Sequence, residues 1–410
     1  MKRRVAITGI GPITPIGTGV DALWAGVRAG RSAVGAITRF DASPFSSRVA
    51  AEIDFDPLCF MTPKRARRLD RFSQLALVSA QLALADAGLT AVEAAGAGAG
   101  AYIGSALGGI AFAEAQHEAF VRHGPRSVNP LLALSVFGGA ASSNVTIELG
   151  LTGPSLANGN SCAAGLIAIG EAARLIADGR VPVMLAGGAE APLSPLAFGA
   201  FAMIRVLSTR NDDPATASRP FDRDRDGFVI AEGATLLVLE SFEHAQARGA
   251  RIYAELAGYG TTSDAHHMTA PHPDGMHAAR AMCHALNSAG LAPEAIDYVN
   301  AHGSSTVLND VTECRAIRLA LGAHADHISL SGTKGLHGHA LGATGAIETA
   351  ICALALARRH LPGTANLERL DPGCDLDVIP PGGRPGHAAH LLCNAFGFGG
   401  VNASLALSAV

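Results

Sequence analysis

The stretch AAGLIAIGEAARLIA, residues 163–177, and a second stretch, GAIETAICALALA, residues 345–357, decide the fold. Each has the length of a helix and is apolar on nearly all sides, as is typical of a helix buried between two layers rather than lying on a surface. One such helix occurs in each part of the chain. We therefore expect an α/β protein with a helical central layer, which is a five-layered sandwich.

Outward from these two helices, the chain alternates strand-like and helical runs, and the series occurs twice. The first series has strands near 5–11, 101–106 and 181–191 and a helix near 74–88. From residue 252 it restarts with IYAELAGYG, continues through a helix near 276–289 and closes with HLLCNAFG at 390–397. No Pro-, Ser- or Gly-rich linker intervenes, so we expect two related halves, 1–251 and 252–410, in one compact unit.

Composition restricts the class of protein further. The 410 residues are 49% hydrophobic and 16% charged, with a net charge of −4, which excludes disorder and gives no global attraction for nucleic acid or anionic membranes. The first apolar run is broken by Gly9 and Gly11, too early for a signal peptide, and no window of about 18 uninterrupted apolar residues predicts a membrane span. We expect a cytoplasmic protein with no nucleic-acid and no membrane partner.

Cys162 occupies a position suited to a nucleophile. It follows the polar loop of GPSLANGNSCAAG and directly precedes the first apolar helix. The positive end of a helix dipole stabilises a thiolate, so a cysteine at this point can be reactive near neutral pH. The alternative, a small buried packing residue, is equally open from position alone. None of the seven cysteines forms a CxxC pair, so no zinc site is expected.

Two histidines lie in Gly-flanked turns of the second half. His302 follows a predicted strand in YVNAHGSST, and His339 precedes the second apolar helix in GTKGLHGHALGATGAIE. Lys334 and Glu348 lie five residues before and nine residues after His339, which adds charged groups to the same region. Such a constellation favours catalysis over a structural role. The neighbouring His337 is expected to support the site or to be exposed.

Four of these segments carry a resemblance. NSCAAG, NAHGSST, GTKGLHGHALGATGAIE and CNAFGFGG stand in the order and approximate spacing of the elongating β-ketoacyl-acyl carrier protein synthases, and RPFDRDRDGFVIAEGA resembles a further signature of that family. The family includes bacterial enzymes of fatty-acid synthesis and ketosynthase subunits of type II polyketide synthases. The resemblance implies the thiolase fold, in which two βαβαβαββ halves form αβαβα layers.

The resemblance also implies a reaction, the decarboxylative Claisen condensation of an acyl group with malonyl-acyl carrier protein. Cys162 would carry the acyl chain, His302 and His339 would assist decarboxylation and condensation, and Lys334 with Glu348 would order the site. The backbone N–H groups of Cys162 and Phe398, the latter in a Gly-rich turn, are the expected oxyanion hole. No cofactor is expected, because loss of CO₂ drives bond formation, and no metal.

Further residues are expected to bind substrate and carrier protein. By resemblance, Leu107, Leu132 and Phe201 line the acyl pocket, and Ser304 and Thr306 lie near the pantetheine arm. The basic segment TPKRARRLDRF forms either a solvated helix face or a docking site for an acidic carrier protein. By resemblance, docking is expected through Lys64, Arg65 and Arg68, together with Arg205.

Two departures from the family pattern concern substrate preference. Serine stands at Ser304 where the family commonly has threonine, and Ala163 and Ala164 follow the cysteine where a hydroxyl residue is frequent. The partner is expected to be acyl carrier protein, with the chain in a homodimer or in a heterodimer with a chain-length subunit.

Three competing signals are weaker. GIGPIT at Gly9 lacks the third glycine of a dinucleotide motif, and DRDRDG at 222–227 lacks the glutamate of a calcium loop at its twelfth position, so we expect a salt-bridged loop there. The histidines of DAHHMTAPHPDGMH lack a metal-binding helical pair and are expected in a loop at the rim of the site.

Two alternative functions stay open: a thiolase-fold acyltransferase or cyclase, and a subunit that works only with a chain-length partner. A catalytically silent partner subunit would lack the cysteine that this chain keeps.

Overall fold

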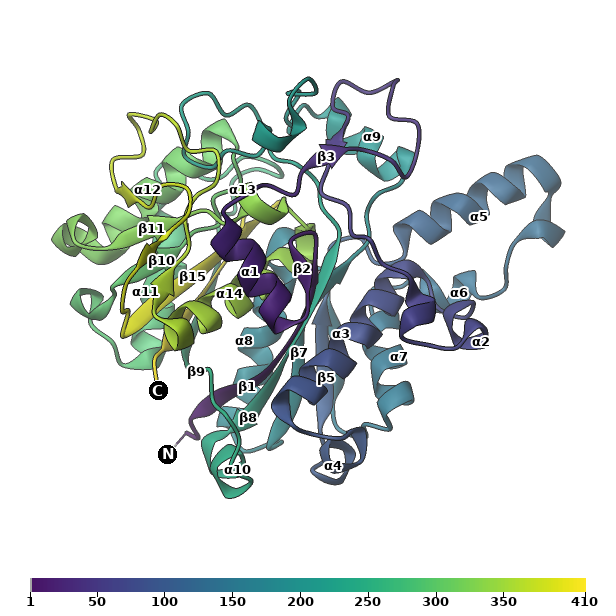
Figure 1. Cartoon of the computed structure of the whole chain (residues 1–410), viewed down its shortest axis with the longest axis horizontal. Helices are drawn as coiled ribbons and strands as arrows, with labels where there is room; N and C mark the ends of the chain where they lie inside the picture. The colour runs from purple at the N-terminus through teal and green to yellow at the C-terminus, as the bar shows by residue number, and fades with distance from the viewer. Residues whose placement is uncertain (1) are drawn as a thin grey trace.

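A computed structural model describes residues 2–410. The strands of the two halves are connected in one mixed sheet, and helices lie between the two halves of this sheet and on their outer faces (Figure 1). The first half contributes β1 Val5–Thr14, β5 Gly100–Gly104, β6 Ser155–Asn158, β7 Val183–Glu190 and β8 Gly233–Ser241. The second contributes β9 Ala254–Ser263, β10 Tyr298–Asn300, β11 Ser329–Ser331, β15 His390–Gly397 and β16 Val401–Ser408. The halves join where Ala6 and Ile7 of β1 pair with Glu255 and Ala254 of β9.

The two halves share one topology. The strands lie in the order β1-β8-β7-β5-β6 in the first half and β9-β16-β15-β10-β11 in the second, so each half reads 1-5-4-2-3 in its own chain order. Strand directions also agree: β5 runs parallel to β6 and β7 while β8 is antiparallel to its neighbours, and β10, β11, β15 and β16 repeat this pattern. The edge strand β13 Asp377–Val378 is an addition to the second half.

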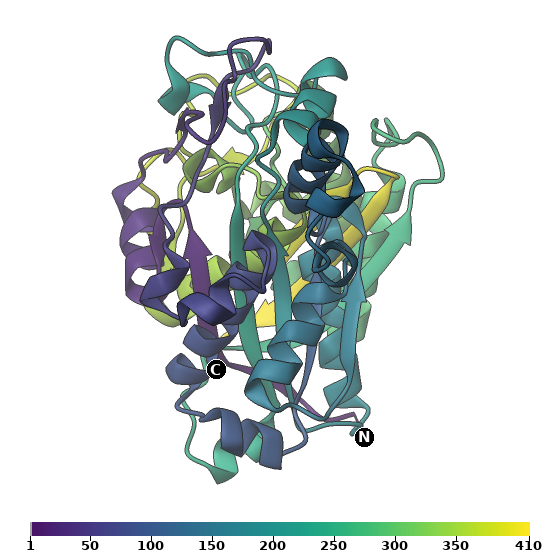
Figure 2. The ribbon, with the colours of Figure 1, turned by 90° about the vertical axis from the view of Figure 1, so that its right-hand side faces the viewer.

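Helices complete five layers (Figures 1 and 2). α8 Ala164–Ala177 and α14 Thr344–Arg358 pack on each other and on strands of both halves, forming the central layer. α3 Arg71–Ala87 and α7 Ala140–Leu149 cover the first half, and α11 Met276–Ala289 and α12 Val307–Leu321 cover the second. The predicted αβαβα sandwich of the thiolase fold is therefore confirmed.

The central helices are buried because their side chains are apolar or small on nearly every side. At their N-terminal ends the backbones approach closely: a Cβ added to Gly165 would lie 2.7 Å from the carbonyl oxygen of Gly342. The window Leu341–Arg358 is long and apolar enough to cross a membrane by composition, but 89% of it is buried inside the molecule, as the core helix of this sandwich.

The remaining elements are short or peripheral. The helices are α1 Val20–Ala29, α2 Pro63–Ala66, α4 Ala91–Gly96, α5 Ile110–His123, α6 Leu132–Ser135, α9 Pro195–Met203, α10 Phe242–Ala247 and α13 Lys334–His337. The strands are β2 Gly17–Thr18, β3 Gly35–Ala36, β4 Val49–Ala50, β12 His360–Leu361 and β14 Arg384–Pro385. Figure 1 shows α5 projecting from the body of the molecule.

Candidate active site

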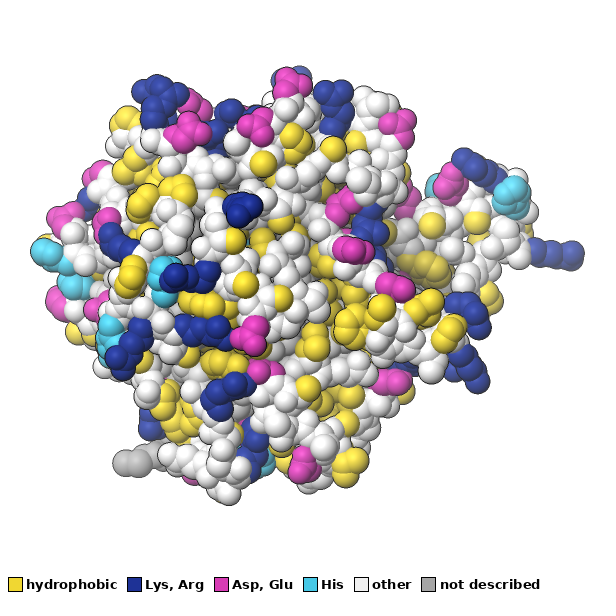
Figure 3. Space-filling model, in the orientation of Figure 1, with side chains coloured by type: hydrophobic (Ala, Val, Ile, Leu, Met, Phe, Trp, Pro, Cys, Tyr) yellow, Lys and Arg dark blue, Asp and Glu magenta, His cyan; other side chains and the backbone are white. Residues whose placement is uncertain are grey.

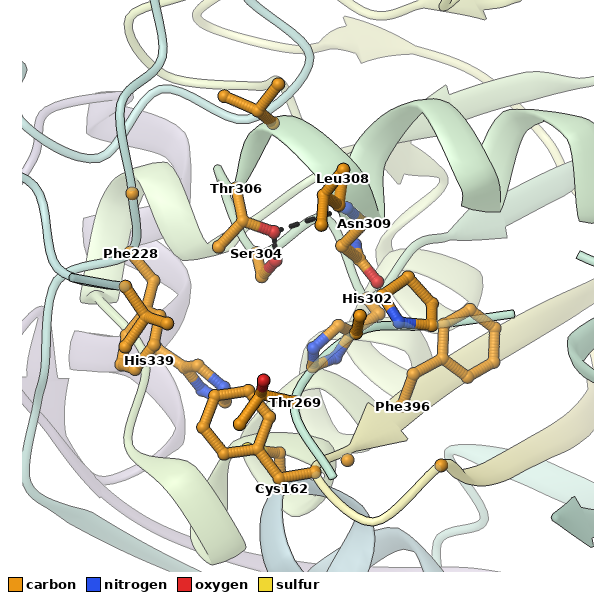
Figure 4. Close-up of a pocket in the computed structure, with 18 of the residues that line it drawn as sticks. Cys162, Phe228, Thr269, His302, Ser304, Thr306, Leu308, Asn309, His339 and Phe396 are labelled. Atoms are coloured by element: carbon orange, nitrogen blue, oxygen red, sulfur yellow. Dashed lines mark hydrogen bonds between the residues drawn. The ribbon is translucent and has the colours of Figure 1, made fainter. Parts of the chain in front are cut away.

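A pocket of about 240 Å³ opens where the two halves meet. Its lining combines Cys162, Arg205 and Phe228 of the first half with residues of the second. The second half contributes among others His302, Ser304, Thr306, His339 and Phe398. Figure 4 shows His302 and His339 facing each other across the pocket, with Cys162 at one end. Seven of the residues singled out in the sequence thus lie around one cavity.

Cys162 lies in a 3₁₀ turn, Ser161–Ala163, immediately before α8. Its side chain is almost entirely buried, with 6% exposure, and the hydroxyl of Ser161 lies 3.8 Å from the sulfur. Burial raises the pKa of Cys162 to about 11, although the Ser161 hydroxyl, the Lys334 charge and the Phe398 N–H oppose this rise. Burial thus opposes the stabilisation of the thiolate that its place before α8 predicts, an effect of typically up to about 2 kcal/mol. The thiol needs a proton acceptor when it reacts.

His302 and His339 supply neutral imidazoles at the same pocket. Their ring centroids are 5.4 Å apart and their planes are nearly perpendicular, at 79°. His302 follows β10, and His339 follows α13. Burial, followed by the positive charge of Lys334, lowers the pKa of each ring well below its ordinary value. Both rings are uncharged at neutral pH, so each offers one N–H donor and one nitrogen lone pair.

Lys334 and Glu348 lie behind the histidines and outside the pocket lining. The Lys334 ammonium contacts the Glu348 carboxylate at 2.7 Å and also donates a hydrogen bond to the carbonyl oxygen of His302. Both side chains are fully buried. Burial raises the pKa of Glu348 to about 7, and the Lys334 charge opposes this rise. The pair therefore sets the position of His302 and the electrostatic potential at both rings.

His337 is also fully buried, and its Nε2 lies 3.2 Å from the hydroxyl of Thr333. That hydroxyl lies 3.4 Å from the Glu348 carboxylate. The exposed alternative for His337 is therefore wrong, because α13 turns this side chain into the hydrogen-bonded cluster around Lys334 and Glu348.

Two buried glutamates that our sequence analysis missed hold the loops of the site. Glu313, on α12, accepts the backbone N–H groups of His302 and Gly303, both at 2.8 Å. Glu190, at the end of β7, accepts the backbone N–H groups of Leu107 and Gly342, both at 3.0 Å, and so ties a loop of the first half to one of the second. Burial raises the pKa of each glutamate to about 7. An acidic residue ending the apolar run VPVMLAGGAEA was the available signal for Glu190.

The expected substrate-binding residues lie in three different places. Ser304 and Thr306 line the pocket with their hydroxyl oxygens 2.9 Å apart. Leu107 and Phe201 belong instead to an apolar cluster that packs around Cys162. Leu132, the first residue of α6, is half-buried and lies apart from this cluster.

The expected carrier-docking residues are all on the surface, but they differ in exposure and in ion pairing. Lys64 and Arg68 are exposed in and beside α2, and Arg205 is exposed at the pocket. Arg65 is half-buried and forms an ion pair with Glu148 at 2.9 Å.

The weaker signals have structural roles. In the loop that resembles a calcium site, Arg219 pairs with Asp222 at 2.9 Å and Arg225 pairs with Asp371 at 2.7 Å, as predicted for a salt-bridged loop. Within residues 2–410 no group of three His, Cys, Asp or Glu side chains is arranged to hold a metal ion. Met268, Thr269, Ala270 and Pro271 of the histidine-rich loop line the pocket, which confirms its place at the rim.

The fold and the pocket together define an acyl-transferring enzyme of the thiolase fold. Residues 2–245 match the N-terminal domain of β-ketoacyl synthases and residues 253–368 match the C-terminal domain. The chain therefore belongs to the β-ketoacyl synthase family.

Individual relatives agree with this assignment over their full lengths. A 3-oxoacyl-[acyl-carrier-protein] synthase 2 of Synechocystis is 47% identical over 99% of this chain and 98% of its own. The structure of a type II polyketide acyl-carrier protein in complex with its ketosynthase is similar with a TM-score of 0.92 and 36% identity, and that of the ishigamide ketosynthase/chain length factor with 0.93 and 37%. Both similarities cover 100% of this chain and of the other.

Proposed function

We propose that this protein is an elongating β-ketoacyl-acyl carrier protein synthase. It joins an acyl group held on Cys162 to malonyl-acyl carrier protein, with loss of CO₂, and releases β-ketoacyl-carrier protein. One observation carries the proposal: Cys162, His302 and His339 come from distant parts of the chain and line the same pocket.

In the first half-reaction the Cys162 sulfur attacks the thioester carbonyl of the incoming acyl group. The thiol proton passes to an imidazole of the pocket, since burial keeps the thiol protonated at neutral pH. The carbonyl electrons move onto oxygen, where the backbone N–H groups of Cys162 and Phe398 stabilise them. Collapse of this oxyanion expels the carrier-bound thiol, which takes a proton, and leaves the acyl group on Cys162.

In the second half-reaction the malonyl thioester loses CO₂, and the electrons of the broken C–C bond form an enolate. N–H donors of His302 and His339 stabilise the enolate oxygen. The enolate carbon then attacks the acyl carbonyl on Cys162, a new C–C bond forms, and the Cys162 sulfur leaves and regains a proton. Burial and the Lys334 charge keep both rings neutral, and Lys334, held by Glu348, fixes the backbone of His302. No cofactor takes part in these steps.

The carrier protein is proposed to dock on the basic segment at α2. Figure 3 shows Lys and Arg side chains gathered on the surface beside α2. Lys64 and Arg68 are exposed there, and Arg205 is exposed at the pocket. A pantetheine arm entering the pocket would pass Ser304 and Thr306, whose hydroxyls are able to bind its amide groups.

A dimer is proposed from exposed apolar side chains. They lie on α5, α6 and α9 and beside them, and include Phe120, Leu134, Phe137, Leu196, Met203 and Ile204. Because α5 contacts both α6 and α9, these side chains lie near one another, and apolar side chains gathered on a surface favour a protein interface. The partner is a second copy of this chain or a chain-length subunit. We further propose a cytoplasmic location and a boundary between the halves at residues 251 and 252, between β8 and β9.

Mass spectrometry tests the proposed function. The protein is incubated with an acyl-carrier thioester and then with malonyl-carrier protein, and both protein and product are weighed intact. We expect the acyl group on Cys162 and then a carrier-bound product longer by two carbons. Acyl transfer without elongation would instead support the acyltransferase or cyclase alternative, and elongation only after addition of a chain-length subunit would support the obligate heterodimer.

A further inference from the structure

The two histidines of the pocket differ in what holds them. The Nδ1 atom of His339 lies 2.9 Å from the hydroxyl oxygen of Thr344, and the ring of Phe228 packs edge-on against the imidazole at 5.1 Å. The Nδ1 atom of His302 is buried and has no hydrogen-bond partner among residues 2–410. One imidazole is therefore fixed by a side chain at its inner nitrogen, and the other is not.

We propose that Thr344 is a positioning residue that fixes the tautomer of His339. The Thr344 hydroxyl donates its hydrogen to Nδ1, so the imidazole hydrogen resides on Nε2, the nitrogen left for the pocket. This inference rests on the proposed function, in which an N–H of His339 stabilises the enolate.

The surroundings of Thr344 decide the direction of this hydrogen bond. A hydroxyl is able to donate to a histidine nitrogen or to accept from it. The Thr344 side chain is buried, with 1% exposure, and its hydroxyl has no hydrogen-bond acceptor other than Nδ1 within residues 2–410. A buried hydroxyl hydrogen without an acceptor is unfavourable, so donation to Nδ1 is the satisfied arrangement.

The start of α14 favours the same direction. Thr344 is the first residue of this 15-residue helix, whose first-turn N–H groups carry the positive end of the helix dipole. A nitrogen lone pair facing that end is favourable, and an N–H hydrogen facing it is not. Nδ1 therefore acts as an acceptor, and His339 presents Nε2–H to the substrate.

His302 has no such constraint. Its inner nitrogen has no partner, so the protein does not impose one tautomer on this ring. The enolate thus meets one preset donor, His339, beside a ring whose tautomer no hydrogen bond at Nδ1 selects within residues 2–410. Where a catalytic histidine is held in the wrong tautomer, the rate falls by up to about 10⁴, so fixing it matters.

Three variants of the full-length protein test the inference. Thr344→Val keeps the shape and removes the hydroxyl, and Thr344→Ser keeps the hydroxyl. Thr349→Val is the matched control, because Thr349 is a fully buried threonine of the same helix whose hydroxyl donates to the Gly345 carbonyl at 2.7 Å. Each is assayed for decarboxylation of malonyl-carrier protein, for acylation of Cys162 and, by ¹⁵N NMR of the histidines, for the tautomer of His339.

We expect Thr344→Val to lose at least about tenfold in kcat for decarboxylation with a nearly unchanged KM, because the loss falls on the transition state. Cys162 acylation stays near the wild-type rate. Thr344→Ser and Thr349→Val retain decarboxylation, and the ¹⁵N spectrum shows Nε2–H at His339 in the wild type but a mixture in Thr344→Val.

Three results would overturn the inference: Nδ1–H at His339 in the wild type, equal rates for Thr344→Val and Thr349→Val, or an equal loss in Thr344→Ser and Thr344→Val. If Thr344→Val does not fold, the ¹⁵N spectrum of the wild type and the activity of Thr344→Ser still test whether Thr344 fixes the tautomer of His339. A wild-type protein that does not decarboxylate malonyl-carrier protein contradicts the proposed function instead, while the spectrum still reports the tautomer.

Discussion

The ammonium of Lys334 and the carboxylate of Glu348 lie 2.7 Å apart with neither side chain exposed to solvent. Lys334 comes from α13 and Glu348 from α14, so the ion pair connects the turn before His339 to the central helix. Removing two charges from water costs several kcal/mol per ion, which only their mutual attraction and further hydrogen bonds offset. The pair therefore contributes little net stability to the fold, and its role is to position the residues of the site.

Removing only Glu348 from this pair should destabilise the protein more than replacing both Lys334 and Glu348 by uncharged residues. Glu348→Gln leaves the Lys334 charge buried without a counter-ion and should lower the free energy of unfolding by about 3–5 kcal/mol. Adding Lys334→Met should restore much of that loss without restoring activity. Urea unfolding of the single and double variants measures both effects. A double variant no more stable than Glu348→Gln would contradict this account.

Asp222 should stabilise the salt-bridged loop in a pH-dependent way. Burial alone would raise the pKa of Asp222, but Arg219 and the backbone N–H groups of Glu368, Arg369 and Asp224 lower it to about 2. A carboxyl with a lowered folded-state pKa contributes stability above its unfolded-state pKa, and loses it as the pH falls toward the folded-state value.

We expect Asp222→Asn to cost about 2 kcal/mol at pH 7 and roughly half of that at pH 3. Urea unfolding at both pH values checks this expectation. If the difference in unfolding free energy between wild type and Asp222→Asn stayed constant or grew as the pH fell, the predicted direction of the pH dependence would be wrong.

Leu107 should limit the length of the acyl chain. It packs in the apolar cluster around Cys162, and its backbone N–H is held by Glu190. Leu107→Phe should shorten the longest accepted acyl group, because filling a packed site typically costs about 1–3 kcal/mol. Products are measured by mass spectrometry. Leu319→Phe, an exposed position of α12, is the control, and an unchanged product distribution in Leu107→Phe would show that Leu107 does not contact the acyl chain.

The basic segment at α2 should affect the binding of the carrier protein rather than the rate of the chemical steps. Lys64→Glu with Arg68→Glu should raise KM for malonyl-carrier protein more than KM for a small thioester mimic. The defect should shrink with salt, since the Debye length is about 8 Å at physiological ionic strength. The charge-matched control is Lys2→Glu with Arg180→Glu, both exposed positions. Equal defects with the two substrates would place docking elsewhere.

The fold could be predicted from the sequence where a local pattern of residues determines the structure. The helices at 163–177 and 345–357 are apolar on nearly all sides, and that property alone predicts a central layer. The burial of Cys162, which raises the pKa of its thiol, could not be predicted, because the position before a helix is visible in the sequence and burial is not. Glu190 was missed because its partners, at Leu107 and Gly342, lie far away along the chain and meet only in the folded protein.

The two half-reactions should depend on different residues, and their separation tests the proposed mechanism. Cys162→Gln should abolish acyl loading and condensation yet leave decarboxylation of malonyl-carrier protein measurable, because an amide replaces the thiol while both histidine donors remain. Transfer of a radiolabelled acyl group to the protein and formation of acetyl-carrier protein from malonyl-carrier protein measure the two activities.

The histidine variants should show the opposite pattern. His302→Ala or His339→Ala should suppress CO₂ release while sparing some acylation of Cys162, since each removes a donor typically worth about 3 to 4 kcal/mol in the transition state. The His339 loss should exceed that of Thr344→Val, which removes only the group that orients this ring. Acylation of Cys162→Gln, or decarboxylation at the wild-type rate in both histidine variants, would show that the residues do not divide the reaction in this way.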